Sequence, residues 1–210
     1  MSTVAQTELS RDPEPVRGRA AAEEKLITAA ADLLAEVGPR AMSVRQIAQR
    51  AGVNHGLVHH YFKGKEGLLR AAMAHLVEEH ARWAKEQSSG NVVPAPLALL
   101  GDQRYLRAVL RAVLDGEPEL AQMELSTDVS VPRAALRQAV ARRGDDDATI
   151  GTKAAFGAVM ALEMGWAALE PFIFAVTETS GAEADEVRAT VTEFRRRMAG
   201  RYFNDFLARK

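Results

Sequence analysis

The side chains with the widest choice of chemistry gather in one short stretch, residues 54–60, which contains His55, His59 and His60. His55 and His59 are four positions apart, a spacing that places two imidazoles on one face of a helix and can hold a metal ion. No Cys, Asp or Glu lies in that stretch to complete such a site, so we expect neither a metal nor another cofactor. The remaining use of these imidazoles is hydrogen bonding to a partner molecule.

Two short helices are needed to position this stretch, and the surrounding residues predict both. Ser43 opens the first helix, and Gln46 three positions later completes a capping box. Gly52 allows a tight turn, and Asn54 is a favourable N-cap for a second helix of about two turns. This order is typical of a helix-turn-helix, whose second helix is short enough to enter the major groove of DNA. The residues expected to be exposed on it are His55, Leu57, His59 and His60.

The same part of the chain resembles the tetracycline-repressor (TetR/AcrR) family of transcriptional regulators. The matching segments read KLITAAADLLAEVG and SVRQIAQRAGVNHGLVHHYFKGKEGLL, and the resemblance covers roughly residues 20–80. It implies an N-terminal head of three helices that binds DNA, and a larger C-terminal helical domain that senses a ligand and dimerises. It also implies that the last two helices, at about residues 148–178 and 183–207, pair with their copies in a four-helix bundle.

By this resemblance, the residues around the helix-turn-helix contact a double-stranded DNA operator. Ser43, Arg45 and Lys65 stand where members of the family touch phosphate, and Lys63 is a further candidate for the DNA backbone. Leu57 is suited to contact a thymine methyl group. The full set of expected DNA contacts is Ser43, Arg45, His55, Gly56, Leu57, His59, His60, Tyr61, Lys63 and Lys65.

Charge also favours a polyanion as partner of the N-terminal quarter of the chain. The 210 residues are 47% apolar and 26% charged, which are ordinary globular values and exclude disorder of the whole chain. Residues 15–65 carry eight Lys/Arg and four Asp/Glu, a balance of +4, whereas residues 66–210 carry eighteen and twenty-one, a balance of −3. The absence of cysteine excludes disulfides and fits the cytoplasm.

Helical periodicity runs through almost the whole chain and predicts an all-α fold of about nine helices. We expect a disordered tail at residues 1–16, the DNA-binding head at residues 17–64 and the second domain at residues 65–210. A linker is expected at residues 88–96. Residues 154–176 could span a bilayer by length, but Glu163, Glu170 and Pro171 favour a helix buried on most sides by protein, so no membrane partner is expected.

The helix predicted from about residue 148 has two opposite faces. Large Met and aromatic side chains around Glu163 suit an adaptable apolar pocket, or an ordinary core in which Glu163 pairs with an arginine. Small residues on the other face suit a close helix neighbour, and the pattern leaves open which face meets a dimer partner. The expected pocket residues are Trp83, Tyr105, Met123, Phe156, Val159, Met160, Glu163 and Trp166. The expected dimer residues are Gly157, Ala161, Gly165, Ala168, Val187, Val191, Phe194, Met198 and Tyr202.

Together these features predict a homodimeric, ligand-responsive repressor that leaves a palindromic operator when a small, largely apolar effector binds. A DNA-binding regulator or activator without a small-molecule ligand is the alternative. A helical enzyme that uses the apolar pocket is a remote one. No enzyme is expected, because the chain has no Ser-His-Asp spacing, glycine-rich phosphate loop or paired metal motif.

Overall fold

The fold, seen in a computed structural model of the chain, is all-α over the described residues, 14–88 and 95–204. Side chains are described for residues 18–88 and 95–198. These ranges contain nine α-helices and two short 3-10 helices, η1 and η2, and no strand, as the periodicity predicts. The elements are α1 (Glu14–Ala41), α2 (Val44–Ala51), α3 (Gly56–Phe62), α4 (Lys65–Gln87), η1 (Ala98–Gly101), α5 (Gln103–Leu114), α6 (Pro118–Ala121), η2 (Gln122–Ser126), α7 (Val131–Arg143), α8 (Ile150–Val176) and α9 (Gly181–Asn204).

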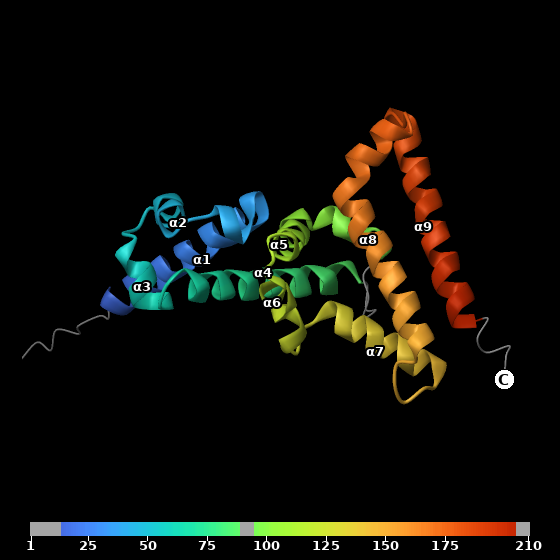
Figure 1. Cartoon of the computed structure of the whole chain (residues 1–210), viewed down its shortest axis with the longest axis horizontal. Helices are drawn as coiled ribbons and strands as arrows, with labels where there is room; N and C mark the ends of the chain where they lie inside the picture. Colours follow the sequence, from blue (N-terminus) through green and yellow to red (C-terminus); the bar gives the residue numbers. More distant parts are fainter. Residues whose placement is uncertain (1–13, 89–94, 205–210) are drawn as a thin grey trace, which may run out of the picture.

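The helices form an elongated molecule with the short helices α2 and α3 at one end and the α8–α9 hairpin at the other (Figure 1). α4 starts beside α3 and runs into the middle of the molecule, where it meets α5, α6 and η2. α5 packs in turn on α1, α4 and α8. The two ends are therefore joined through α4, which packs on α3, and α5, which packs on both α4 and α8.

One apolar core holds the first five helices together. Leu34 of α1, Ile47 of α2, Val58 of α3 and Leu68 of α4 are completely buried in it, and Ala108 of α5 belongs to the same cluster. Helical spacing places such residues on one stripe of each helix, and burial of these stripes supplies most of the stability. The domain boundary expected after residue 64 therefore does not separate two cores.

The helix-turn-helix forms where the capping signals predict it. Ser43 Oγ accepts from the Gln46 backbone N–H at 3.2 Å, and Gln46 Oε1 accepts from the Ser43 backbone N–H at 2.8 Å, which closes the capping box. Gly52 ends α2 with a left-handed backbone, φ 67°. Asn54 Oδ1 accepts from the Gly56 N–H at 2.8 Å where α3 begins. The predictions of the capping box and of the Gly52 turn are confirmed, whereas the N-cap of α3 is His55, one position after the expected Asn54.

The end of α1 is held by α5. Backbone φ of 83° at Gly38 kinks α1, which continues beyond the kink to Ala41. Asp115 Oδ2 accepts from the Arg40 N–H at 3.0 Å, and Arg111 Nε donates to the Ala35 carbonyl at 3.1 Å. α5 thereby satisfies polar groups that a helix end leaves without partners.

Two segments that the sequence predicts, the N-terminal tail and the linker, agree with the structure only in part. Residues 1–13 of the expected tail lie outside the described residues, and residues 14–16 belong to the first turn of α1, where Pro15 is tolerated. Ser88, expected to open the linker, is the buried C-cap of α4, and its hydroxyl donates to the Lys85 carbonyl at 2.8 Å. Residues 89–94 of that linker lie outside the described residues.

The expectation that α8 is buried on most sides is wrong for the single chain. α8 is long and apolar enough to cross a membrane, but only 11% of its most apolar 18-residue window is buried. Ile150 is 88% exposed and Phe172 67% exposed. α8 packs mainly on α5, α7, α9 and η1, and much of its surface has no neighbour within the described part of the chain.

Candidate nucleic-acid interface and internal cavity

α3 and its flanking residues present one polar arc to solvent. At about 100° per residue, five positions fall within an arc of about 140°. All five are exposed, and they are His55, Gly56, His59, His60 and Lys63. Val58 lies on the opposite side and is completely buried, so it anchors α3 to the core. Among the described residues no group of three or more His, Cys, Asp or Glu side chains is arranged to hold a metal.

Leu57 and Tyr61 lie on the inner arc of α3, so Leu57, which was expected to be exposed, is exposed only in part. Both are half-buried and pack against the core, because their positions on the helix fall next to that of Val58. The guanidinium of Arg19 lies 5.2 Å from the centre of the Tyr61 ring, a cation–π distance. Arg19 is also paired with Glu23 at 2.7 Å.

Cationic and hydroxyl side chains surround this arc, and they differ in how far they are exposed to solvent. Ser43 and Arg45 are exposed at the start of α2, and Lys63 is exposed between α3 and α4. Lys65 is half-buried, and its Nζ donates to the carbonyl of Pro39 at 2.7 Å. The Lys65 ammonium is therefore held against the kinked end of α1.

The junction of α3 and α4 depends on close backbone contact. Gly64 has φ 123°, a conformation that side chains with a Cβ rarely adopt. A Cβ on Gly67 would lie 1.9 Å from the carbonyl oxygen of Phe62, closer than any real contact. The absence of a side chain at position 67 thus lets the first turn of α4 press on the end of α3.

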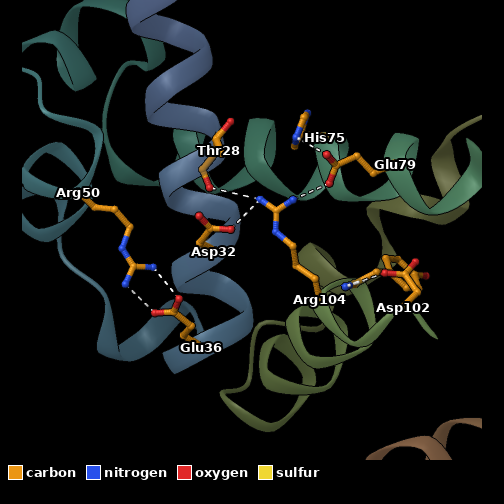
Figure 2. Close-up of polar contacts among 9 residues, drawn as sticks. Thr28, Asp32, Glu36, Arg50, His75, Glu79, Asp102 and Arg104 are labelled. Atoms are coloured by element: carbon orange, nitrogen blue, oxygen red, sulfur yellow. Dashed lines mark hydrogen bonds and ion pairs between the residues drawn. The ribbon is translucent and has the colours of Figure 1, made fainter. Parts of the chain in front are cut away.

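An arginine of α5 links the head to the middle of the molecule (Figure 2). Arg104 Nη1 donates to Glu79 of α4 at 2.6 Å, and its Nη2 lies 2.9 Å from Asp32 of α1. Nη2 also donates to the Thr28 carbonyl at 3.4 Å, and His75 pairs with Glu79 at 3.1 Å. Sequence reasoning missed Arg104, because its partners are far away along the chain and only the fold brings them together.

A cavity of about 700 Å³ lies in the C-terminal half, between α4, α5, α7, α8 and the short helices. Six of the eight expected pocket residues line it: Trp83, Tyr105, Phe156, Val159, Met160 and Glu163. Met123 does not, because it lies in the 3-10 helix η2 and packs against the apolar core. Trp166 does not either, since it lies further along α8 and its Nε1 donates to Glu170 at 2.9 Å.

The cavity wall contains polar groups that sequence reasoning did not select. His80 is buried and stacks on the Tyr105 ring, with centres 3.9 Å apart, and its Nδ1 lies 2.8 Å from Asp102 Oδ2. The Tyr105 hydroxyl donates to Glu124, which also accepts from the Val131 N–H at 3.1 Å. Burial, together with the Glu124 carboxylate, raises the pKa of Tyr105, so its hydroxyl stays protonated and donates.

Glu163 forms the arginine pair that the sequence left as an alternative to a pocket, and it also lines the cavity. Its Oε1 lies 2.8 Å from Arg195 Nε, and its Oε2 accepts from the Leu97 N–H at 2.7 Å. Burial raises the pKa of Glu163, opposed by Arg195 and by the Leu97 N–H. Glu163 Oε1 and Arg195 Nε are both buried without an aligned hydrogen bond.

The residues expected at a dimer interface form an open surface on the α8–α9 hairpin. Gly157, Ala161 and Ala168 are exposed, and a Cβ added at Gly157 or at half-buried Gly165 would meet nothing within 4 Å. Phe194 of α9 is 60% exposed. Val187, Val191 and Met198 are half-buried, and the side chain of Tyr202 lies outside those described. The small face of α8 thus has no close helix neighbour within the described chain.

Comparison with known sequences identifies the class of protein. The family model "Bacterial regulatory proteins, tetR family" matches residues 26–72. An HTH-type transcriptional repressor of Mycobacterium tuberculosis is 33% identical over 176 residues, which cover 84% of this chain and 88% of the relative. The HTH-type transcriptional regulator BetI of Yersinia pestis is 34% identical over 110 residues, 52% of this chain and 48% of the relative.

Solved structures agree on the fold. A Rhodococcus sp. protein assigned to the TetR family matches with a TM-score of 0.59 at 19% identity, covering 85% of this chain and 98% of the other. A mutant of HlyIIR matches with a TM-score of 0.54 at 13% identity, covering 83% and 98%. The chain belongs to the TetR family of bacterial transcriptional regulators. Regulators of this family bind DNA and typically act as dimers, and they are not enzymes.

Proposed function

We propose that this regulator is a homodimeric repressor that holds a palindromic operator and leaves it when a small, largely apolar effector fills the cavity. The observation that carries the proposal is the exposed polar arc of α3, held by Val58 on its inner side. The cavity of about 700 Å³ supports the effector. The M. tuberculosis relative is named a repressor. The proposed location is the cytoplasm.

In this proposal the outer arc of α3 enters the major groove. His55, His59 and His60 form hydrogen bonds with base edges or nearby phosphates, and Gly56 lets the helix approach closely. Leu57 and Tyr61 contribute only their exposed edges, Leu57 to a thymine methyl group and Tyr61 to the DNA backbone. Phosphate contacts come from Ser43, Arg45, Lys63 and the remaining donors of Lys65.

The open surface of the α8–α9 hairpin is assigned to the second copy. Large side chains of α8 such as Phe156 and Met160 face the cavity, so the small-residue face is the one left for a partner. Contact with a second copy accounts for the apolar surface of α8 without a membrane. The two carboxylates of α8 do not oppose this contact, because each pairs with an arginine of α9. Two copies paired there present two α3 helices to successive major grooves.

A chain of direct contacts joins the cavity to the head, which supports the response to an effector. Tyr105 lines the cavity, and the preceding residue, Arg104, holds Asp32 of α1 and Glu79 of α4 (Figure 2). An effector that moves the start of α5 relative to α4 thus shifts the ion pairs that position α1. If it binds better to a form with displaced heads, it lowers the DNA-bound population.

Selection of binding sites from random duplex DNA tests the proposal. We expect the wild-type protein to enrich a site with two half-sites about one helical turn apart. His60→Ala changes the bases enriched in each half-site, whereas Arg142→Ala, an exposed change at the end of α7, does not. Enrichment of no site by the wild type contradicts DNA reading, and an unchanged site in His60→Ala contradicts the role of the α3 arc.

A further inference from the structure

We propose that the cavity takes a lipophilic cation, an apolar ligand of aromatic size with one positive charge that is seated on the Glu124 carboxylate. This inference rests on the proposed function in that the cavity is the effector site. It adds the charge and chemical class of the ligand.

Charged residues of both signs face the cavity, and only some of them are paired. Glu124 and Glu163 line it, and Asp102 stands directly behind His80. Glu163 pairs with Arg195, and Asp102 faces His80. Arg133 also lines the cavity, but it is exposed and forms no ion pair with Glu124 among the described residues. Glu124 is therefore the lining carboxylate that no cation reaches within the described residues.

Glu124 is also deeply buried. Its side chain is only 4% exposed. The donors that reach its carboxylate within the described residues are the Tyr105 hydroxyl and the Val131 N–H, which are both neutral. A buried carboxylate without a cation is costly, whereas each of its oxygens can accept further hydrogen bonds. A cationic ligand supplies the missing charge.

The walls around Glu124 suit the rest of such a ligand. Tyr105, Trp83 and Phe156 contribute aromatic rings, and the stacked His80 keeps the Tyr105 ring in place. Aromatic faces attract cations, and the attraction is strongest where water is excluded. A volume of about 700 Å³ accommodates a ligand of several rings.

An anionic ligand fits the same walls less well. The half-buried guanidinium of Arg195 already lies 2.8 Å from Glu163, which also accepts from the Leu97 N–H. An anion that takes Arg195 leaves the Glu163 carboxylate without its cation and adds a charge of the same sign as Glu124. Breaking a buried pair in this way is strongly unfavourable.

Two ions of nearly equal size and shape and opposite charge test this inference on the full-length protein. Tetraphenylphosphonium and tetraphenylborate are titrated in sodium buffer, with binding followed by calorimetry and by emission of Trp83 in the cavity wall. We expect the cation to bind at least about tenfold more tightly than the anion. Equal affinities, or tighter binding of tetraphenylborate, overturn the inference without any variant.

Glu124→Gln removes the charge and keeps an acceptor for Tyr105 and Val131. We expect it to weaken binding of tetraphenylphosphonium about tenfold or more and to leave tetraphenylborate unaffected or bound more tightly. Glu119→Gln, an exposed change on α6, is the matched control and should leave both ions unchanged. Thermal unfolding of both variants checks the fold, and an unchanged cation affinity in folded Glu124→Gln overturns the assignment to Glu124.

Operator binding measured beside these titrations separates the inference from the proposed function. A protein that binds its operator but not tetraphenylphosphonium contradicts the inference alone. A protein that binds tetraphenylphosphonium but no duplex DNA contradicts the proposed function alone. Cation binding that lowers operator affinity supports both, and cation binding that leaves it unchanged supports the ligand class and overturns the effector role.

Discussion

Arg45 is an exposed cation in the first turn of α2, beside the capping box of Ser43. If it contacts a phosphate, its loss weakens binding by a similar factor on every duplex sequence. We expect Arg45→Ala to reduce the slope of log affinity against log salt concentration by about one. Arg142→Ala, an equally exposed change on α7, should leave affinity and slope unchanged. A loss confined to one DNA sequence assigns Arg45 to base reading instead.

Single residues also mark the limit of prediction from sequence. Ser43 and Gly52 were predictable because their roles depend on neighbours within three positions. Leu57 and Met123 were not, since the side that each presents depends on the rotation and winding of its helix against the core. Resemblance to a family supplies the position of a residue on a motif, and packing decides how much of the side chain remains available.

The angle between α3 and α4 depends on Gly67, whose missing side chain leaves room for the Phe62 carbonyl. Gly67→Ala must push the two helices apart, because the added Cβ meets backbone that cannot rotate away. We expect the free energy of unfolding to fall by about 1–3 kcal/mol and operator binding to weaken with it. Chemical denaturation measures the first and operator titration the second.

Gly18→Ala is the control for this change. Gly18 is an exposed helical glycine of α1 with nothing within 4 Å of an added Cβ. Alanine there should keep or raise the stability, by up to about 1 kcal/mol, because it favours the helix. If Gly67→Ala is as stable as Gly18→Ala, the contact between α3 and α4 is not tight in solution.

The link between α1, α4 and α5 depends on Arg104, which faces Asp32 and Glu79 at once (Figure 2). Arg104→Met keeps much of the apolar part of the side chain and leaves two carboxylates facing each other. We expect the free energy of unfolding to fall by about 1 kcal/mol, since the groups are partly solvated. Operator affinity should fall at least about fivefold, because the ion pair that positions Asp32 of α1 against α5 is lost.

Arg107→Met tests whether these effects belong to the ion pairs. Arg107 lies three residues further along α5 and is exposed. The change removes the same charge from the same helix, and it should alter neither stability nor operator affinity by a comparable amount. Equal losses in both variants indicate that net charge, rather than the link to Asp32 and Glu79, controls operator binding.

At the scale of the whole molecule, contacts within one chain bury the apolar residues of the first five helices but leave apolar residues of the α8–α9 hairpin exposed. The apolar pattern of α8 predicted a buried helix, and the single chain leaves Leu169, Phe172 and Val176 more than half exposed. Sequence could predict that this surface needs cover. It could not say which contacts are within the chain, because a stripe buried by a neighbouring helix and one buried by a second copy have the same spacing.

A substitution of Phe194 tests whether a second copy buries the α8–α9 surface, because this side chain is 60% exposed in the single chain. Phe194→Glu should leave the fold of each chain intact, since the new carboxylate remains in water. In a symmetric dimer the change occurs twice, and each buried carboxylate lacks a partner.

We expect sedimentation at micromolar concentration to give twice the chain mass of 22.8 kDa for the wild type and 22.8 kDa for Phe194→Glu, with loss of operator binding. Leu114→Glu, which places the same charge on a residue 83% exposed at the end of α5, should remain dimeric. A wild type that sediments as a single chain, or a Phe194→Glu variant that stays paired, rules out the α8–α9 surface as the dimer interface.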